Sequence, residues 1–318
     1  MATPFASSAD RGERTETFEV LADGVYALTA EGDPNVGAVE GENFLVCFDA
    51  RATPLLADRW LTRLRERTAK PVRYLVLSHF HANRTLGANA FGAETVLAHT
   101  ETRRLVAERG EQDRASEFGR TPRLFEGHAT IPGLTWPTVT FTDRVTIELG
   151  GDRGVVELAW LGRGHTSGDV VAWLPRQRVL FAGDLVETRA AVHTGDGYHQ
   201  DWLRTLDRVA GLGAEVLVGG RGEVARGRDQ VDGAIQHTRD FLTTLLGCVT
   251  AAQRSGGTLE EAFRAADNSL TPTFGRMPLY NHVLPFDVTR AWDELAGEEH
   301  PEIWTPERDH EVWRRLRG

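Results

Sequence analysis

One stretch constrains the fold more than any other: a short apolar run that ends at two histidines one residue apart. The run Tyr74–Leu77 is followed by His79 and His81. A short apolar run bounded by polar residues predicts a buried strand that ends at a sheet edge. Where the chain stays extended beyond the strand, residues i and i+2 point the same way, so both imidazoles could reach one metal ion. Alone, the pair is weak evidence.

The composition is that of an ordinary globular protein. The 318 residues are 41% hydrophobic and 26% charged, which is enough for one large domain or two smaller ones. The net charge of −10 argues against a nucleic-acid partner, and the absence of a long apolar stretch argues against a membrane partner. Cys47 and Cys248 lie far apart and are expected to be reduced thiols, and residues 1–17 lack the apolar segment of a signal peptide. These features predict a cytoplasmic protein, and they leave the oligomeric state open.

The rest of the chain alternates strands and helices in two rounds. Strands are expected at 18–28 (two strands around a turn), 35–38, 43–49, 73–77, 95–98, 138–142, 145–149, 155–161, 170–174, 178–182 and 215–218. Helices are expected at 55–68, 83–90, 100–109, 202–212 and 229–266, with a charged irregular insertion at 111–133 and a mixed tail after 266. This order predicts an α/β protein with two sheets covered by helices.

Three later segments share the design of the first. Each is an apolar strand followed by a glycine-containing loop with a polar residue: Gly164-His165-Thr166-Ser167-Gly168-Asp169, Gly183-Asp184 and Gly220-Arg221. Side chains on loops at one edge of a rigid sheet can converge on a single site, and glycine permits the tight turns this requires. Each loop alone could equally be a structural turn.

Taken together, the ordered series resembles the metallo-β-lactamase fold superfamily of glyoxalase II-like metallo-hydrolases. That family carries His-x-His-x-Asp-His, Gly-His-(Thr/Ser)-x-Gly-(Asp/Ser), Gly-Asp and Gly-His at successive strand ends, and this chain begins the series with His79-Phe80-His81-Ala82-Asn83-Arg84. The resemblance implies a four-layer αββα sandwich of two mixed β sheets over residues 18–228. It leaves 1–17 as a disordered or extended N-terminus and 229–318 as a helical C-terminal extension on the same domain.

The resemblance also implies a metal site. His79, His81 and His165 match the three histidines that hold one metal ion in the family, and Asp184 matches the bridging aspartate. Three imidazoles and a carboxylate suit Zn²⁺ with an open position for catalysis, although Fe²⁺ or Mn²⁺ accept the same ligands. Zn²⁺ lowers the pKa of a bound water to about 7, which supplies hydroxide at neutral pH.

The ligands of the family's second metal are absent. Asn83, Arg84 and Arg221 occupy their three positions. An amide is a poor ligand, and a guanidinium group stays charged and has no lone pair for a cation. The loss of one site's ligands alone predicts a single metal ion. The two arginines would either pair with Asp184 or hold an anionic or carbonyl group of the substrate.

These residues predict a mononuclear metallo-hydrolase that cleaves an ester-like bond in a small molecule: a thioester, lactone or related acyl compound. Because Asn83 replaces the family's usual aspartate, deprotonation would fall to Asp184 or to the metal-bound hydroxide, with Arg84 and Arg221 stabilising a developing oxyanion. Two alternatives stay open: a weakly metal-binding or non-catalytic protein that keeps the fold, and a non-hydrolytic redox or cyclising enzyme.

The loop after Asp184 supplies further candidates. Tyr198 and His199 are predicted substrate contacts or proton donors, and His199 could instead replace a lost metal ligand. A packing role is an equal alternative for both residues. Tyr280 and His282 could reach the pocket from the C-terminal extension.

Overall fold

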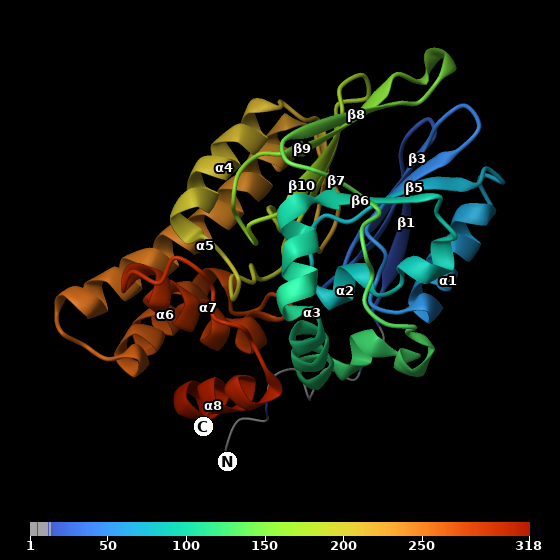
Figure 1. Cartoon of the computed structure of the whole chain (residues 1–318). Helices are drawn as coiled ribbons and strands as arrows, with labels where there is room; N and C mark the ends of the chain where they lie inside the picture. The colour runs from blue at the N-terminus through green and yellow to red at the C-terminus, as the bar shows by residue number, and fades with distance from the viewer. Residues whose placement is uncertain (1–4, 6–11, 13) are drawn as a thin grey trace.

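The computed structural model describes residues 5, 12 and 14–318, in which two mixed β sheets lie face to face with helices on their outer faces (Figure 1). The seven strands of the first sheet lie in chain order: β1 (Glu16–Ala22), β2 (Val25–Ala30), β3 (Val36–Glu40), β4 (Leu45–Phe48), β5 (Val72–Val76), β6 (Thr95–His99) and β7 (Val139–Phe141). The second sheet has the order β13 (Ala225–Arg226), β12 (Val216–Gly219), β11 (Val179–Gly183), β10 (Val170–Leu174), β9 (Val155–Trp160) and β8 (Arg144–Glu148).

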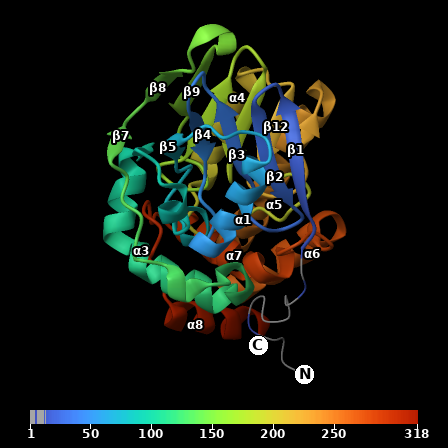
Figure 2. The same cartoon turned by 90° about the vertical axis from the view of Figure 1, so that its right-hand side faces the viewer.

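The helices divide between the two outer faces and the bottom of the molecule as drawn in Figure 1 and Figure 2. They are α1 (Pro54–Arg65), α2 (Ala82–Thr85), α3 (Thr100–Arg120), α4 (His199–Gly211), α5 (Arg228–Arg254), α6 (Leu259–Phe274), α7 (Tyr280–Leu295) and α8 (Pro306–Arg317). Short 3₁₀ turns lie at Ala88–Phe91, Pro122–Phe125, His128–Thr130 and Gly151–Arg153. Of the helices in the described residues, none combines the length and apolar character needed to cross a bilayer.

Three buried clusters confirm the predicted four-layer αββα sandwich. One packs α1 against the first sheet, the second lies between the sheets, and the third packs α4 to α7 against the second sheet. Helix α1 illustrates how the sequence specifies a layer. Thr53 caps its first turn, Pro54 begins it, and Trp60 and Leu64 point one turn apart into the core.

The strand arrangement brings the polar loops to one edge of the sandwich. Strands β4 to β7 are parallel, as are β11 and β12, while the other neighbouring strands are antiparallel. The loop after β5 is tied to the second sheet because the Ser78 carbonyl accepts a hydrogen bond of 2.8 Å from the Val170 amide. Val170 begins β10, which is antiparallel to β11, and β11 is parallel to β12. The carboxyl ends of β5, β11 and β12 therefore lie at the same edge of the sandwich.

Two predicted segments are wrong. The insertion expected to be irregular at 111–133 is helical in its first half, because α3 continues to Arg120. Its inner face carries buried polar residues, among them Asp113 and Glu117, so the apolar periodicity that marks a helix is missing. The tail expected to be mixed contains α7 and α8, and Pro285 lies inside α7, where proline normally argues against a helix.

The sequence also predicts a segment at each end of the sandwich domain. Most of the N-terminal segment expected to be disordered or extended lies outside the described residues, although Glu16 and Thr17 already belong to β1. Helix α5 begins at Arg228, and α5 to α7 share one buried cluster with the second sheet. The C-terminal residues thus form part of the same packed unit.

The close contact between the sheets at Gly37 yields a stability prediction. A β-carbon on Gly37 would lie 2.3 Å from the Phe181 ring of the opposite sheet, so we expect Gly37→Ala to lower the free energy of unfolding by about 1–3 kcal/mol. The matched control is Gly247→Ala in α5, where nothing lies within 4 Å and alanine should stabilise the helix by roughly 0.5–1 kcal/mol. Urea unfolding of the two variants measures both effects; equal stability would contradict the packing described.

Candidate metal centre

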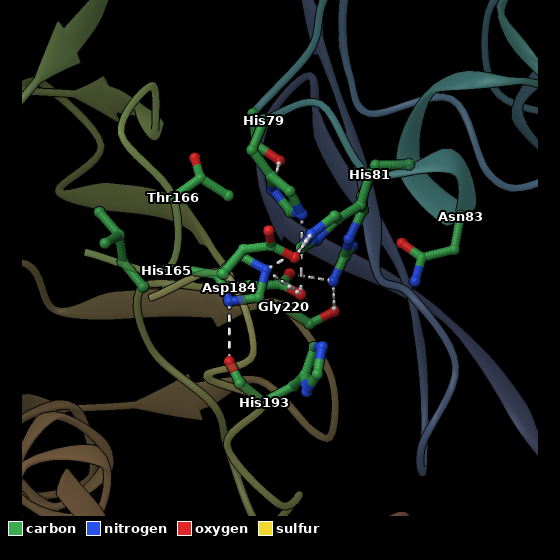
Figure 3. A network of polar contacts seen from close by, with 12 residues as sticks. His79, His81, Asn83, His165, Thr166, Asp184, His193 and Gly220 are labelled. Carbon is green, nitrogen blue, oxygen red and sulfur yellow. Dashed lines mark hydrogen bonds and ion pairs between the residues drawn. The ribbon is translucent and has the colours of Figure 1, made fainter. Parts of the chain in front are cut away.

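Three histidines converge at the sheet edge (Figure 3). His79 and His81 follow β5, and His165 lies in the loop between β9 and β10. One nitrogen of each ring lies within 4.8 Å of the other two, and His81 Nδ1 is 3.0 Å from His165 Nε2. Exposed fractions of 1–2% bury all three side chains. Within the part of the chain that the structure describes, this is the one group of three or more His, Cys, Asp or Glu side chains close enough to hold a metal ion.

The hydrogen bonds of His79 leave an unpaired nitrogen facing this group. Ser78 Oγ donates to Asp49 Oδ2 at 2.8 Å, so at 2.9 Å it must accept from His79 Nδ1–H. This assignment puts the lone pair of His79 on Nε2, which is buried and has no hydrogen-bond partner. A buried polar atom without a partner is costly, so it calls for an explanation such as a bound ion.

The other two rings are oriented in the same way. The His193 carbonyl can only accept, so at 2.9 Å it accepts a hydrogen bond from His165 Nδ1–H. The lone pair of the neutral His165 ring is therefore on Nε2. His81 Nε2 lies 3.1 Å from Asp196 Oδ2, which leaves Nδ1 turned toward the group. Partners on the outer nitrogens orient metal-binding histidines in this manner. The donor set therefore fits a cation such as Zn²⁺, held by His79, His81 and His165.

The charge states of the rings follow from their surroundings. Burial lowers the pKa of His79 well below its usual value and that of His165 to about 3, so both are neutral, as a metal ligand must be. Burial also opposes charge on His81, but Asp113 and Asp196 outweigh it and raise the pKa of His81 to about 9. These carboxylates make His81 the most basic of the three imidazoles.

Asp184 lies beside the histidines and is held by two arginines. Its Oδ2 is 3.6 Å from His165 Nε2 and 3.9 Å from His79 Nε2. Arg221 Nη1 donates to the same oxygen at 2.7 Å, and Arg84 Nη2 donates to Oδ1. Arg84 and Arg221 thus pair with Asp184, which is the first of the two roles expected from the sequence.

The two guanidinium groups also have other protein partners. Arg84 is fully buried and donates to the carbonyls of Asn35 and Gly220 at 2.8 and 2.7 Å, while Arg221 Nη1 donates to Glu187 at 2.9 Å. Gly220 must be glycine for this approach, because a β-carbon would lie 2.3 Å from Asp184 Oδ1. Contacts of this kind leave Arg84 no exposed surface with which to touch a substrate.

The predicted role of Asp184 as a base has no support from its surroundings. Burial opposes its charge, but Arg84 and Arg221 outweigh burial and hold the pKa of Asp184 well below its usual value. Both oxygens are also engaged by guanidinium groups. A carboxylate so stabilised accepts protons poorly, whereas it remains a good anionic ligand.

Three other predicted residues lie apart from the histidines. The Asn83 amide donates to Glu117 Oε1 at 2.9 Å, and Figure 3 shows its side chain to one side of the rings. The Tyr198 ring packs under Arg163, with the guanidinium carbon 4.4 Å from the ring centre. His199 is fully buried with Nδ1 on Glu294 at 2.7 Å and Nε2 on Thr194 at 2.8 Å, so it cannot replace a lost metal ligand. The packing alternative therefore describes Tyr198 and His199 better than substrate contact does.

The two candidates from the C-terminal extension, Tyr280 and His282, lie in different surroundings. Tyr280 is in the apolar cluster under the second sheet, and its hydroxyl contacts Asp267 at 3.1 Å, so it does not reach the histidines. His282 is buried against Trp313, with a ring-centre distance of 6.4 Å, and its Nδ1 has no partner. Burial, together with the positive charges of Arg120 and Arg221, lowers the pKa of His282 well below its usual value, so its ring is neutral.

Five polar residues around the site were not predicted from the sequence. Ser78 and Asp196 contact His79 and His81, and Asp113 lies 4.0 Å from His81 Nε2. Glu117 accepts from Asn83, and Glu187 accepts from Arg221. Ser78 immediately precedes His79, and Asp196 stands between two glycines in the loop already singled out, so both could have been considered. Asp113 and Glu117 are one helical turn apart on α3, a relation hidden by the expectation of irregular structure there.

Comparisons with known proteins agree with this geometry. Residues 30–221, more than half of the chain, match the family model of the Metallo-beta-lactamase superfamily. The metallo-beta-lactamase type 2 of Bacillus cereus is 24% identical over 266 residues, which cover 76% of this chain and 93% of that protein. The linear primary-alkylsulfatase of Pseudomonas sp. (strain ATCC 19151) is 24% identical over 240 residues, which cover 64% of this chain but only 44% of that protein.

A solved structure shows the same fold. The metallo-beta-lactamase from Pontibacter korlensis superposes with a TM-score of 0.57 at 22% identity, and the match covers 72% of this chain and 99% of that one. The family match, the relatives and the shared fold lead to one conclusion: this chain belongs to the metallo-beta-lactamase superfamily, and it carries a group of three histidines placed to bind metal.

Proposed function

We propose that the protein is a hydrolase that uses one metal ion to cleave an ester-like bond in a thioester, lactone or related acyl compound. The observation that carries the proposal is the buried, unpartnered Nε2 of His79, which faces the inner nitrogens of His81 and His165. Zn²⁺ is the expected ion, and Fe²⁺ or Mn²⁺ accept the same ligands. When bound, the ion would supply Lewis acidity that activates water and polarises a carbonyl group.

The proposal of a single ion is supported by the ion pairs of Asp184. The guanidinium groups of Arg84 and Arg221 lie on its two oxygens, at the positions where the family motif has ligands of a second metal. Two permanent positive charges there repel a second cation. In this account the arginines balance the charge of Asp184 and aim its Oδ2 at the histidines, and Asp184 serves as a ligand rather than as a base.

The surroundings of the site restrict water. The histidines and Asp184 are at most 3% exposed, so bulk solvent does not reach them in the conformation described. Electrostatic interactions are stronger in such a site than in water. A substrate must therefore displace covering segments to enter, a step that commonly limits the rate in enzymes with closed sites.

Two observations support the proposed substrate class. Relatives are named for the hydrolysis of β-lactams and alkyl sulfates, which are small organic molecules. The net charge of −10 does not favour a polyanionic substrate such as nucleic acid. A small acyl compound agrees with both observations.

A substrate scan tests the hydrolase proposal. We expect a panel of thioesters and lactones to contain at least one compound that the metal-loaded protein cleaves, and His165→Ala to lower kcat/KM by about 10³-fold or more through loss of a ligand. His128→Ala is the control, because it removes a histidine whose ring contacts Phe118 outside the site, with the ring centres 4.9 Å apart. Equal rates for the parent and His165→Ala across the panel would rule out the hydrolase.

Metal removal separates the enzyme from a protein that merely keeps the fold. We expect treatment with a chelator to abolish activity and to lower Tm, since an ion bound only by the folded state stabilises it. Elemental analysis and thermal melts before and after treatment measure the effect, with Zn²⁺ added back as the control. An unchanged Tm together with no bound metal would favour the binding alternative.

The charge balance at Asp184 gives a stability prediction. Asp184→Asn keeps the shape but leaves Arg84 and Arg221 with less negative charge in a buried site, so we expect a loss of about 3–5 kcal/mol in the presence of chelator. The control is Glu126→Gln, which breaks an exposed pair with Arg59 and should change stability by about 1 kcal/mol or less. Similar losses in the two variants would contradict a buried ionic cluster at Asp184.

A further inference from the structure

The loop 193–198, between β11 and α4, orients two of the three histidines. The His193 carbonyl accepts from His165 Nδ1 at 2.9 Å, and Asp196 Oδ2 lies 3.1 Å from His81 Nε2. Figure 3 shows His193 directly below His165, with the dashed line from its carbonyl to the ring. The direction of two metal-binding rings therefore depends on the conformation of these few residues.

The C-terminal extension contacts three residues of this loop and the first residue of α4. The contacts come from α7 and the segment that follows it: Asp287 Oδ1 to the Thr194 amide at 2.6 Å, Trp304 Nε1 to the Gly195 carbonyl at 2.9 Å, Arg290 Nε to the Gly197 carbonyl at 2.7 Å, and Glu294 Oε2 to His199 Nδ1 at 2.7 Å. Arg109 of α3 joins both sides, since its Nη1 donates to Asp196 at 3.2 Å and to the Pro301 carbonyl at 3.0 Å.

One of these contacts acts on the metal centre through a single peptide group. The carbonyl of His193 and the amide N–H of Thr194 belong to the same peptide unit, which is planar. Asp287 accepts from the N–H, and the carbonyl at the other end accepts from His165. A carboxylate that fixes the N–H therefore also fixes the direction of the carbonyl, and through it the rotation of the His165 ring.

The Asp287 side chain has little freedom to move because it is buried within α7. Asp287 is fully buried in the middle of α7, and the Arg290 side chain one turn later is 1% exposed. Hydrogen bonds in such surroundings are strengthened by the low local dielectric, and packed side chains have little freedom to move. The extension thus holds the peptide in one orientation.

We propose that Asp287 is a positioning residue for the metal centre, and that α7 sets the orientation of His165 by holding the peptide between His193 and Thr194. Trp304 has the same function one step along the loop, where it holds the peptide that leads into Asp196. The C-terminal extension is then part of the metal site, although it supplies no ligand. This inference rests on metal binding by the three histidines and does not depend on hydrolysis.

The test measures metal binding without substrate. Zn²⁺ affinity by chelator competition and the visible absorption of the Co²⁺-loaded protein are compared for the parent, Asp287→Ala, Asp287→Asn and Trp304→Phe. We expect Asp287→Ala to raise the Kd for Zn²⁺ by about tenfold and to change the Co²⁺ spectrum, as is typical for lost supporting partners of metal ligands. Asp287→Asn should restore both, because burial raises the pKa of Asp287 well above its usual value and a neutral amide oxygen can accept the same bond.

The matched control is Tyr280→Phe, on the same helix. It removes a hydroxyl that contacts Asp267 and Thr271 of α6 and leaves the loop contacts in place, so it should lower Tm without changing the Kd or the spectrum. Trp304→Phe keeps an aromatic ring and tests the proposal if Asp287→Ala does not fold; we expect a several-fold higher Kd. Parent-like Kd values and spectra in the loop variants, or an equal change in Tyr280→Phe, would overturn the proposal. Protein that binds Co²⁺ as proposed but cleaves no substrate would overturn only the hydrolase.

Discussion

The Asp184 carboxylate, held between two buried guanidinium groups, is the interaction on which the rest of the site depends. Arg84 lies on α2, which follows β5 of the first sheet, whereas Asp184 and Arg221 follow β11 and β12 of the second sheet, so the cluster connects the edges of both sheets. Burying three charges requires that each be paired and hydrogen-bonded. The carbonyls of Asn35 and Gly220 and the carboxylate of Glu187 supply such partners, although Nε of each guanidinium group is buried without a hydrogen bond to the described residues. The outcome is a fixed carboxylate oxygen beside the histidines.

Beside Asp184, each imidazole is oriented by a different kind of partner. Ser78, which donates to Asp49, orients His79. The main-chain carbonyl of His193 orients His165, and the carboxylate of Asp196 orients His81. Burial keeps two of the rings neutral, while the acidic groups near His81 raise its basicity. The partners come from the segments after β4 and β5 of the first sheet and from the loop that the C-terminal extension holds, so the orientation of the histidines depends on more than one motif.

The order of strands and helices predicted two sheets covered by helices, and the apolar run of β5 that ends at His79 and His81 suggested a metal site. The four-layer arrangement and the third histidine, His165, followed from the resemblance to the superfamily. The sequence could not show whether Arg84 and Arg221 pair with Asp184 or hold a group of the substrate, because an arginine suits either role. The position of Asp184 in the structure shows that they pair with it. The predicted helix at 100–109 ends before α3 does, because the inner face of α3 is polar at Asp113 and Glu117 and lacks the apolar pattern of a helix. Tyr198 and His199 were predicted to contact substrate because the sequence does not show their distant partners: Arg163 for Tyr198, and Glu294, 95 residues later, for His199. Long-range polar contacts leave no local pattern.

The number and surroundings of bound metal ions test the central claim most directly. Protein loaded with excess Zn²⁺ and freed of unbound ions would be examined by elemental analysis and by X-ray absorption at the zinc edge. One equivalent of zinc with about three imidazole nitrogens and one oxygen near 2.0–2.1 Å, and no second metal within about 4 Å, is the predicted result. Two equivalents with a metal–metal distance of about 3.5–4 Å would contradict the assignment of Arg84 and Arg221 as substitutes for the second ion.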